Sequence, residues 1–256
     1  MDRRLVVVLP GTRDTSRNIV KHLKDLDIEF MIIPVIDVEI DHAEVESARK
    51  AFSSGFTPDI SVFTSKTAVK VVKKFIPEAW KHAEKRLLAI GPGTASLLKR
   101  LGAENVEVPE KHSSEGLINF LSNIMKNSSL ALYCSKYVNL HLEEFIKENF
   151  DSFRIFKLYT IIEKEENLEK LIKHVKSCSG KFYIIIVTSL KILKILSEEK
   201  LLSAQNIVYS VMSRRLLSEA LKLNLPICHE FSASDLNLYY ENLRSFIKKL
   251  LTSQND

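Results

Sequence analysis

Short apolar runs that alternate with amphipathic stretches constrain the fold of this chain most strongly. Leu5 to Leu9 is an uninterrupted apolar run rich in valine, as expected of a strand that is buried on both faces. A turn at Pro10-Gly11-Thr12 ends it, and apolar residues then recur at helical spacing from Ile19 to Leu26. We expect Thr15 or Ser16 to cap this helix. The same strand, turn and helix order continues along the chain and predicts parallel sheets covered by helices.

The number of expected strands favours two domains over one. Further strands are expected near residues 30–35, 60–63, 86–90, 106–108, 130–133, 154–162, 182–187 and 207–212, with helices between most of them. Ten or so strands exceed one compact sheet, and 256 residues are enough for two α/β domains. A hydrophobic content of 45% and a charged content of 27% exclude a disordered or collagen-like chain.

An internal repeat supports two similar domains. The stretch Asp59 to Lys66 recurs as Tyr183 to Leu190, and in both copies an apolar strand ends in Thr-Ser. The stretch Ile90 to Gly102 can be laid without gaps on Met212 to Asn224, with matching apolar helix positions. Each half therefore has a strand–Thr-Ser–helix unit followed by a strand–turn–helix unit.

Charge and cysteine content exclude several classes of partner. The 37 basic and 32 acidic residues give a net charge of +5, but they interleave, so no basic block for nucleic acid forms. The three cysteines lie far apart without metal-ligand spacing, which indicates reduced thiols, a cytoplasmic protein and no bound metal. No apolar run approaches the ~20 residues of a membrane span, and the N-terminal run is too short for a signal peptide.

Thr64-Ser65-Lys66 is the first candidate binding site, because ligands of parallel sheets bind where strands end and helices begin. Its two hydroxyls and the free helix amides can hold a carboxylate or phosphate oxygen. The alternative is that Thr64 or Ser65 only caps its own helix. The Thr-Ser pair recurs at Thr188-Ser189, and we therefore weigh the binding and the capping interpretations equally.

Two further features have an equally open interpretation. In Gly91-Pro92-Gly93-Thr94 the glycines let the backbone approach a ligand closely, although a plain tight turn explains them as well. The third glycine of a dinucleotide fingerprint is replaced by Ser96, and no Walker ending follows. Tyr159 is either a packing aromatic or a phenol that faces an interdomain cleft. With no His–carboxylate–nucleophile set, the chain resembles either a binding protein or an enzyme without an obvious acid or base.

The order of these motifs resembles the uroporphyrinogen-III synthase family over nearly the whole chain. The matching segments are Thr12-Arg13, Ile33 to Ile36, Val62 to Ser65 with Ala68-Val69, Ala89 to Ala95 with Gly102, Val108-Pro109, Tyr159, and Val187 to Ser189. Each motif is weak alone, and the resemblance rests on their order and spacing.

The resemblance implies two α/β domains joined by a two-stranded connector, with the substrate cleft between them. The first domain would be discontinuous, residues 1–36 plus 162–256, and the second would be inserted as residues 38–158. The extended segments Val35 to Val38 and Tyr159 to Ile162 would form the connector. We expect a monomer.

The implied reaction is ring closure of hydroxymethylbilane, a linear tetrapyrrole, with inversion of its last ring and loss of water. This is a lyase reaction that uses no metal or organic cofactor. The substrate carries acetate and propionate groups on every ring, so helix N-termini, amides and hydroxyls would hold a polyanion. Hydroxymethylbilane synthase would hand the substrate over.

The resemblance also assigns roles to residues. Tyr159 matches the family's best side-chain candidate for assisting departure of the hydroxyl group. The substrate-binding candidates are Arg13, Thr64, Ser65, Lys66, Gly91, Gly93, Thr94, Ser135, Thr188, Ser189 and Ser213.

Three of these positions depart from the pattern or have a competing interpretation. Ser213 and Leu216 stand where the second half normally repeats Gly-x-x-Thr, and a leucine cannot offer a hydroxyl. Ser135-Lys136 replaces a frequent Gly and Arg. Arg13 could instead form a surface salt bridge.

Two alternatives stay open at this point. One is a two-domain binding or regulatory protein for a small anionic ligand, which the missing second Gly-x-x-Thr favours. The other is an NAD(P)-dependent enzyme built on Gly91-Pro92-Gly93, which the absent third glycine disfavours.

Overall fold

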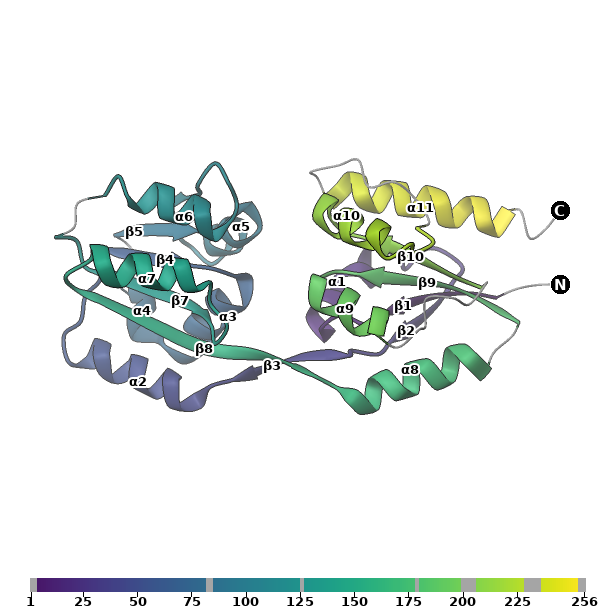
Figure 1. The fold of residues 1–256 in the computed structure, drawn as a ribbon, viewed down its shortest axis with the longest axis horizontal. Coiled ribbons are helices and arrows are strands. Elements are labelled where there is room, and N and C mark those ends of the chain that lie inside the picture. Colours follow the sequence, from purple (N-terminus) through teal and green to yellow (C-terminus); the bar gives the residue numbers. More distant parts are fainter. Residues whose placement is uncertain are drawn as a thin grey trace. The chain divides into compact units, whose positions relative to one another are not determined.

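The chain folds into two compact α/β units. The computed structural model describes residues 4–81, 85–124, 127–177, 180–198, 206–227 and 236–252. Unit 1 comprises Met1–Asp37 and Ile162–Asp256, and unit 2 comprises Val38–Ile161. Strands β3 (Ile36–Ile40) and β8 (Phe153–Glu163) both continue across this division of the chain (Figure 1). The predicted α/β class with parallel sheets is confirmed.

Unit 1 is built on a four-stranded sheet in the order β10-β9-β1-β2, and all its strand pairs are parallel. The strands are β1 (Arg4–Leu9), β2 (Glu29–Ile32), β9 (Lys181–Val187) and β10 (Ile207–Val211). The helices are α1 (Arg13–Leu23), α8 (Glu165–Ser177), α9 (Leu190–Glu198), α10 (Arg214–Lys222) and α11 (Leu236–Thr252).

The core of unit 1 explains why β1 and β9 read as continuous apolar runs. Val7 in β1 and Ile184 in β9 are fully buried and pack with Ile19 of α1 and Leu243 of α11. Helices α1 and α11 thus cover one face of the central strands (Figure 1). Because the neighbouring residue Val8 points to the opposite face and is also buried, neither face of the sheet is left to water.

Unit 2 is built on a six-stranded sheet in the order β3-β8-β7-β4-β5-β6. Besides β3 and β8, its strands are β4 (Ile60–Phe63), β5 (Arg86–Ala89), β6 (Val106–Glu107) and β7 (Leu130–Ser135). Its helices are α2 (His42–Ser53), α3 (Lys66–Phe75), α4 (Pro77–Lys81), α5 (Pro92–Arg100), α6 (Ser114–Leu121) and α7 (Leu140–Asn149). Strands β4 to β8 pair in parallel, so their carboxyl ends lie at one edge.

Successive residues of β4 pack against different helices. Phe63 belongs to a cluster with residues of α2, α3 and α5, whereas Val62 belongs to a cluster with α6 and α7. The side-chain period of two in a strand produces this alternation. Helices therefore cover both faces of the sheet, and its carboxyl edge is left for turns and helix N-termini (Figure 1).

Two local predictions in unit 1 are wrong. Helix α1 begins at Arg13, directly after Thr12, so Thr15 and Ser16 lie inside the helix and neither caps it. The hydroxyl of the buried Ser16 instead donates to carbonyls of the preceding turn. Strand β2 ends at Ile32 rather than near residue 35, although the amides of Ile33 and Val35 still donate to the carbonyls of Leu9 and Pro10.

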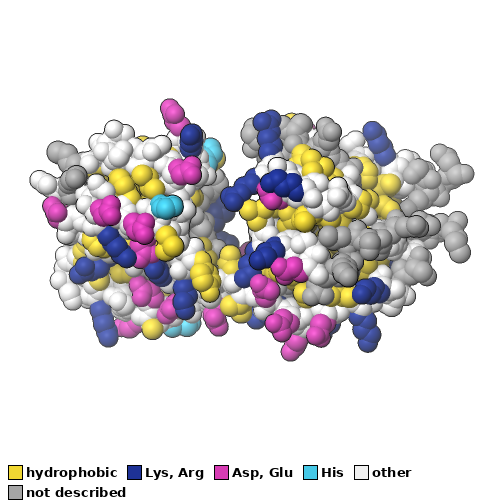
Figure 2. All heavy atoms as spheres, viewed as in Figure 1, with side chains coloured by type: hydrophobic (Ala, Val, Ile, Leu, Met, Phe, Trp, Pro, Cys, Tyr) yellow, Lys and Arg dark blue, Asp and Glu magenta, His cyan; other side chains and the backbone are white. Residues whose placement is uncertain are grey.

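The surface carries both charge signs together. On the visible face of unit 2, Lys and Arg interleave with Asp and Glu (Figure 2). None of the described helices combines the length and apolar character that a membrane crossing demands. Cys134 is a buried free thiol, and Cys178 and Cys228 lie outside the described residues.

Candidate functional site

The carboxyl edge of the unit 2 sheet gathers most of the site residues expected there. Thr64 and Ser65 follow β4, the Gly91 turn follows β5, and Ser135 ends β7. Because these strands are parallel neighbours, their ends lie next to one another.

The hydroxyls of Tyr159 and Ser65 form the central contact of this edge. The Tyr159 oxygen lies 2.7 Å from the Ser65 Oγ. The same Oγ accepts a hydrogen bond of 2.9 Å from the amide of Ala68, so Ser65 also caps α3. Ser65 therefore caps its own helix, as the alternative interpretation expected. The same hydroxyl also contacts Tyr159, so the capping role does not exclude a role at the site.

Burial determines the protonation state of Tyr159. Its side chain is almost fully buried, and this desolvation raises its pKa, while hydrogen bonds with Ser65 and Thr67 oppose the rise. Tyr159 is thus a neutral phenol at neutral pH, able to donate a hydrogen bond.

A cavity of about 280 Å³ lies against Tyr159. Strand β8 places Tyr159 opposite Ser135, where a register shift interrupts the pairing of β7 and β8. The amide of Lys136 donates to the Tyr159 carbonyl at 2.7 Å. The cavity is lined by Glu39, Ile40, Asp41, His42, Lys136, Tyr159 and Thr160.

Sequence reasoning missed most of this lining. Asp41 and His42 begin α2, and the Asp41 side chain caps that helix through the amide of Glu44. Strand β3 lies beside β8, and the Asp41 amide donates to the Leu158 carbonyl of β8. This pairing brings the start of α2 to the level of Tyr159, and it is the signal that would have placed both residues at the cavity.

Lys66 and Gly93 meet although they belong to different helices. A Cβ atom placed on Gly93 would lie 2.9 Å from Cε and 3.2 Å from Nζ of Lys66. The absence of a side chain at Gly93 therefore lets the Lys66 ammonium group lie against the first turn of α5. The exposed Lys66 adds a positive charge where two helix N-termini approach each other.

The other residues of this edge are held by backbone contacts. The amide of Thr94 donates to the Gly91 carbonyl at 3.1 Å, and the Thr94 side chain is buried. Gly91 lies against His112, since a Cβ there would come within 3.3 Å of the His112 Cβ. The Thr64 hydroxyl donates to the Tyr133 carbonyl at 3.2 Å, which fixes its rotamer.

Unit 1 has its own carboxyl edge with the expected hydroxyl groups. Ser189 caps α9 through the amide of Ile192, and Ser213 caps α10 through the amide of Leu216. Thr188 lies beside the turn after β1, because a Cβ on Gly11 would be 3.1 Å from its Oγ1. Leu216 is buried in the core, so its helix offers no hydroxyl at this position.

Arg13 opens α1 and lines a separate cavity in unit 1, together with Arg17 and Asn167. Among the described arginines, Arg49, Arg86 and Arg244 form ion pairs, whereas Arg13 has none with a described residue. The salt-bridge interpretation of Arg13 thus finds no partner among the described residues.

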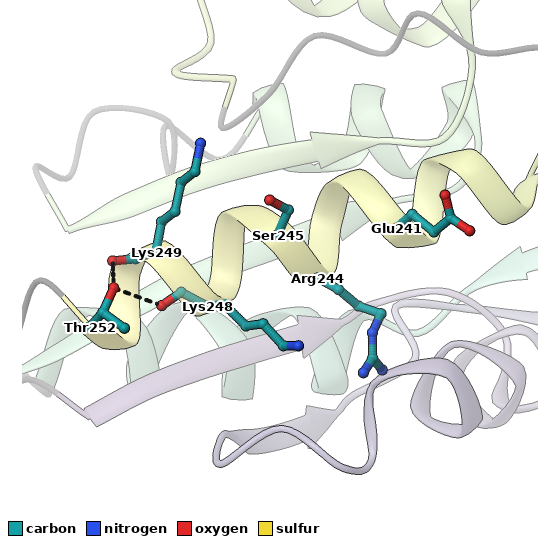
Figure 3. Close-up of a pocket in the computed structure, with 6 residues that line it drawn as sticks. All are labelled: Glu241, Arg244, Ser245, Lys248, Lys249 and Thr252. Atoms are coloured by element: carbon teal, nitrogen blue, oxygen red, sulfur yellow. Dashed lines mark hydrogen bonds between the residues drawn. The ribbon is translucent and has the colours of Figure 1, made fainter.

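A larger hollow of about 480 Å³ follows the surface of α11 (Figure 3). Its lining comes from that helix alone, and the Thr252 hydroxyl bonds to the helix's own carbonyls. Arg244 is already paired with Asp25 at 2.6 Å. This open groove therefore lacks the convergent polar groups of a binding site.

Metal ligands do not gather in the described part of the chain. No group of three His, Cys, Asp or Glu side chains there has the arrangement of a metal site. Hydroxyls, backbone amides and lysine ammonium groups lie at the carboxyl edge of the unit 2 sheet and suit oxygen anions. The cavity beside Tyr159 also has the carboxylates of Glu39 and Asp41 and the imidazole of His42 in its lining.

Comparison with models of protein families gives a match over most of the chain. A family model described as uroporphyrinogen-III synthase HemD matches residues 17–235. No curated protein matches the sequence.

Solved structures share the fold. A mutant uroporphyrinogen III synthase from Thermus thermophilus is similar at 14% identity and a TM-score of 0.64, over 96% of this chain and 99% of that one. A uroporphyrinogen-III synthetase from Helicobacter pylori is similar at 14% identity and a TM-score of 0.58, over 95% of this chain and 99% of that one. These likenesses establish the fold, and the family model spans most of the chain. The chain therefore belongs to the uroporphyrinogen-III synthase family of tetrapyrrole biosynthesis.

Proposed function

We propose that this chain closes hydroxymethylbilane to uroporphyrinogen III, inverting ring D and releasing water, and that the reaction belongs to the lyase class. The observation that carries the proposal is the Tyr159 hydroxyl, held 2.7 Å from Ser65 beside a cavity in a member of this family.

Tyr159 assists departure of the substrate hydroxyl in this account. The amide of Ala68 donates to Ser65 Oγ, which lies 2.7 Å from the Tyr159 oxygen. We assign Ser65 as the donor in this second bond, so that the Tyr159 proton can point to the leaving oxygen. Because burial keeps the phenol protonated, the donor is present throughout the neutral pH range. The pyrrole nitrogen of the substrate assists the same bond cleavage, so no stronger acid is required.

Carboxylate binding falls to the two helix N-termini of the unit 2 edge. The amides that open α3 and α5 point to this edge, and the Lys66 ammonium group lies beside Gly93. Thr64, Thr94 and Ser135 lie at the same edge. In unit 1, Thr188, Ser189, Ser213 and Arg13 would hold further carboxylates.

Positioning supplies most of the catalysis in this proposal. Spontaneous closure of the substrate joins the ring ends without inversion, so the protein must hold ring D in the inverted orientation while the bond forms. Several carboxylate contacts spread over one substrate achieve this with little covalent chemistry.

We propose that the chain acts as a monomer and receives its substrate from hydroxymethylbilane synthase, because a reactive hydroxymethyl compound is protected by direct transfer.

The test generates hydroxymethylbilane enzymatically in the presence of the protein, oxidises the products to porphyrins and separates the isomers. The proposal predicts isomer III as the main product. Isomer I alone, at the rate of the spontaneous reaction, would refute it.

A further inference from the structure

A second cavity in unit 1 combines two arginines with an apolar surface. Its volume is about 330 Å³, and its lining consists of Arg13, Arg17, Ile32, Ile33, Pro34 and Asn167. Arg13 and Arg17 are four residues apart in α1, so both lie on the same side of the helix. Both are exposed, and none of the ion pairs of described arginines includes either of them.

Hydrogen bonds on both sides fix the apolar wall of this cavity. The amides of Ile33 and Val35 donate to the carbonyls of Leu9 and Pro10 at 3.2 Å and 2.9 Å. From the other side, the Asn167 amide group donates to the Pro34 carbonyl at 2.8 Å. The wall is therefore preorganised and is not a loose loop.

The chemistry of the lining selects an amphipathic anion. No acidic side chain is among the lining residues, so the two guanidinium groups are uncompensated within the cavity. Ile32 is an unusually exposed apolar residue, with 46% of its surface accessible. Guanidinium groups bind carboxylates through paired hydrogen bonds, and the neighbouring Ile32 and Pro34 suit the face of a flat ring.

We propose that Arg13 and Arg17 form a subsite for one pyrrole ring of the substrate, in which the guanidinium groups bind the ring's acetate and propionate and the ring lies on Ile32 and Pro34. This inference rests on the proposed function and extends it to Arg17, which no sequence motif singled out. Arg17 acts here by binding and takes no part in bond cleavage.

Kinetics of three variants test the subsite. Arg17→Gln is expected to raise KM for hydroxymethylbilane about tenfold with kcat unchanged, because a charge-assisted contact is lost in ground and transition states alike. Arg17→Lys keeps the positive charge but not the planar guanidinium group with its paired donors, so its KM should lie between that of the unsubstituted protein and that of Arg17→Gln. Arg100→Gln removes the same charge from the last turn of α5 in unit 2 and is the matched control. If KM of Arg17→Gln stays within twofold of this control, the subsite is refuted.

A binding experiment separates this inference from the proposed function. Porphobilinogen, a single pyrrole with one acetate and one propionate, is titrated into the protein while the arginine Nε–H signals are followed by NMR. Shifts of the Arg13 and Arg17 signals support the subsite even if the protein produces no isomer III. A protein that forms isomer III, shows no such shift and keeps its KM in Arg17→Gln would retain its function and refute the subsite.

Discussion

The hydroxyl oxygen of Tyr159 lies 2.7 Å from the Oγ of Ser65, although 94 residues separate the two in the chain. Ser65 at the same time caps α3 by accepting from the Ala68 amide. One hydroxyl thus couples a helix N-terminus to the phenol that we propose as the proton donor.

Replacement of Tyr159 by phenylalanine removes only the hydroxyl and is expected to lower kcat about a hundredfold. This is the low end of the range for general acid catalysis, because the pyrrole nitrogen assists the same bond cleavage. KM should change little. The measurement is the initial rate of isomer III formation under saturating substrate.

Tyr209→Phe is the matched control for this prediction. Tyr209 is a fully buried tyrosine of unit 1 whose hydroxyl has no hydrogen-bond partner among the described residues. Its loss should leave kcat unchanged. A Tyr159→Phe variant with full kcat would show that the phenol does not assist the leaving group.

The pH profile of kcat follows from the direction of the Tyr159 pKa. Burial raises this pKa above its ordinary value of 10.0, so the phenol stays protonated below that pH and ionises only above it. We expect no loss of kcat from this group near neutral pH, and an alkaline fall with its midpoint above pH 10.0 that Tyr159→Phe lacks. A tyrosine-dependent fall that begins below pH 9 would contradict the assignment.

Ser65→Ala and Ser113→Ala separate capping from catalysis. Ser65 caps α3 and Ser113 caps α6 in the same geometry, so each substitution should lower the free energy of unfolding by about 1 kcal/mol. Only Ser65 also touches Tyr159, so only Ser65→Ala should reduce kcat. Urea denaturation and isomer III kinetics measured on both variants make the comparison, and equal kcat values would refute the link.

Gly93→Ala is expected to act through Lys66. The new methyl group would meet the end of the Lys66 side chain, which is flexible and can move aside, so the fold should persist while the ammonium group is displaced. KM should rise about three- to tenfold, as in Lys66→Gln. Because both changes remove one contact, the double variant should be no worse than either single variant.

Gly180→Ala is the control for the glycine substitution, since nothing lies within 4 Å of a Cβ at that position. Gly180→Ala should leave the KM for hydroxymethylbilane at the value of the unsubstituted protein. Additive losses in the double variant of Gly93 and Lys66 would indicate two independent contacts.

Asp59 should contribute stability that is lost in acid. The hydrogen bonds from Lys85 and from Ser129 lower its pKa to about 2. The stabilisation is therefore fully present above the ordinary value of 3.8 and disappears as the pH falls towards 2. Because half of the side chain is exposed, we expect no more than about 1 kcal/mol.

Asp59→Asn tests this expectation. The difference in unfolding free energy between the original chain and the variant should shrink from pH 7 to pH 2. Glu166→Gln disrupts a highly exposed ion pair with Lys170 and should change stability little at any pH. A constant Asp59→Asn difference across the range would contradict the ionic origin.

Patterns within short stretches predicted much of the fold. Buried strands such as β1 and β9 read as apolar runs because both faces are covered, and the family resemblance is confirmed by the model that matches residues 17–235. The start of α1 was misplaced because the tight turn at Gly11 leads into the helix at Arg13 and uses Ser16 to bond back to it.

Contacts that depend on strand register and helix approach could not be predicted from the sequence. The pairing of β7 with β8 and the register shift after Cys134 bring Tyr159 opposite Ser135. The meeting of Lys66 with Gly93 requires the spacing of α3 and α5 over neighbouring strands. Neither leaves a local signature, because each joins residues from separate elements.

The most direct test of the central claim measures the fraction of isomer III in the product as the protein concentration increases at fixed hydroxymethylbilane. We predict that this fraction rises from near zero, where spontaneous closure to isomer I dominates, towards one. A product that remains isomer I at every protein concentration would contradict the account.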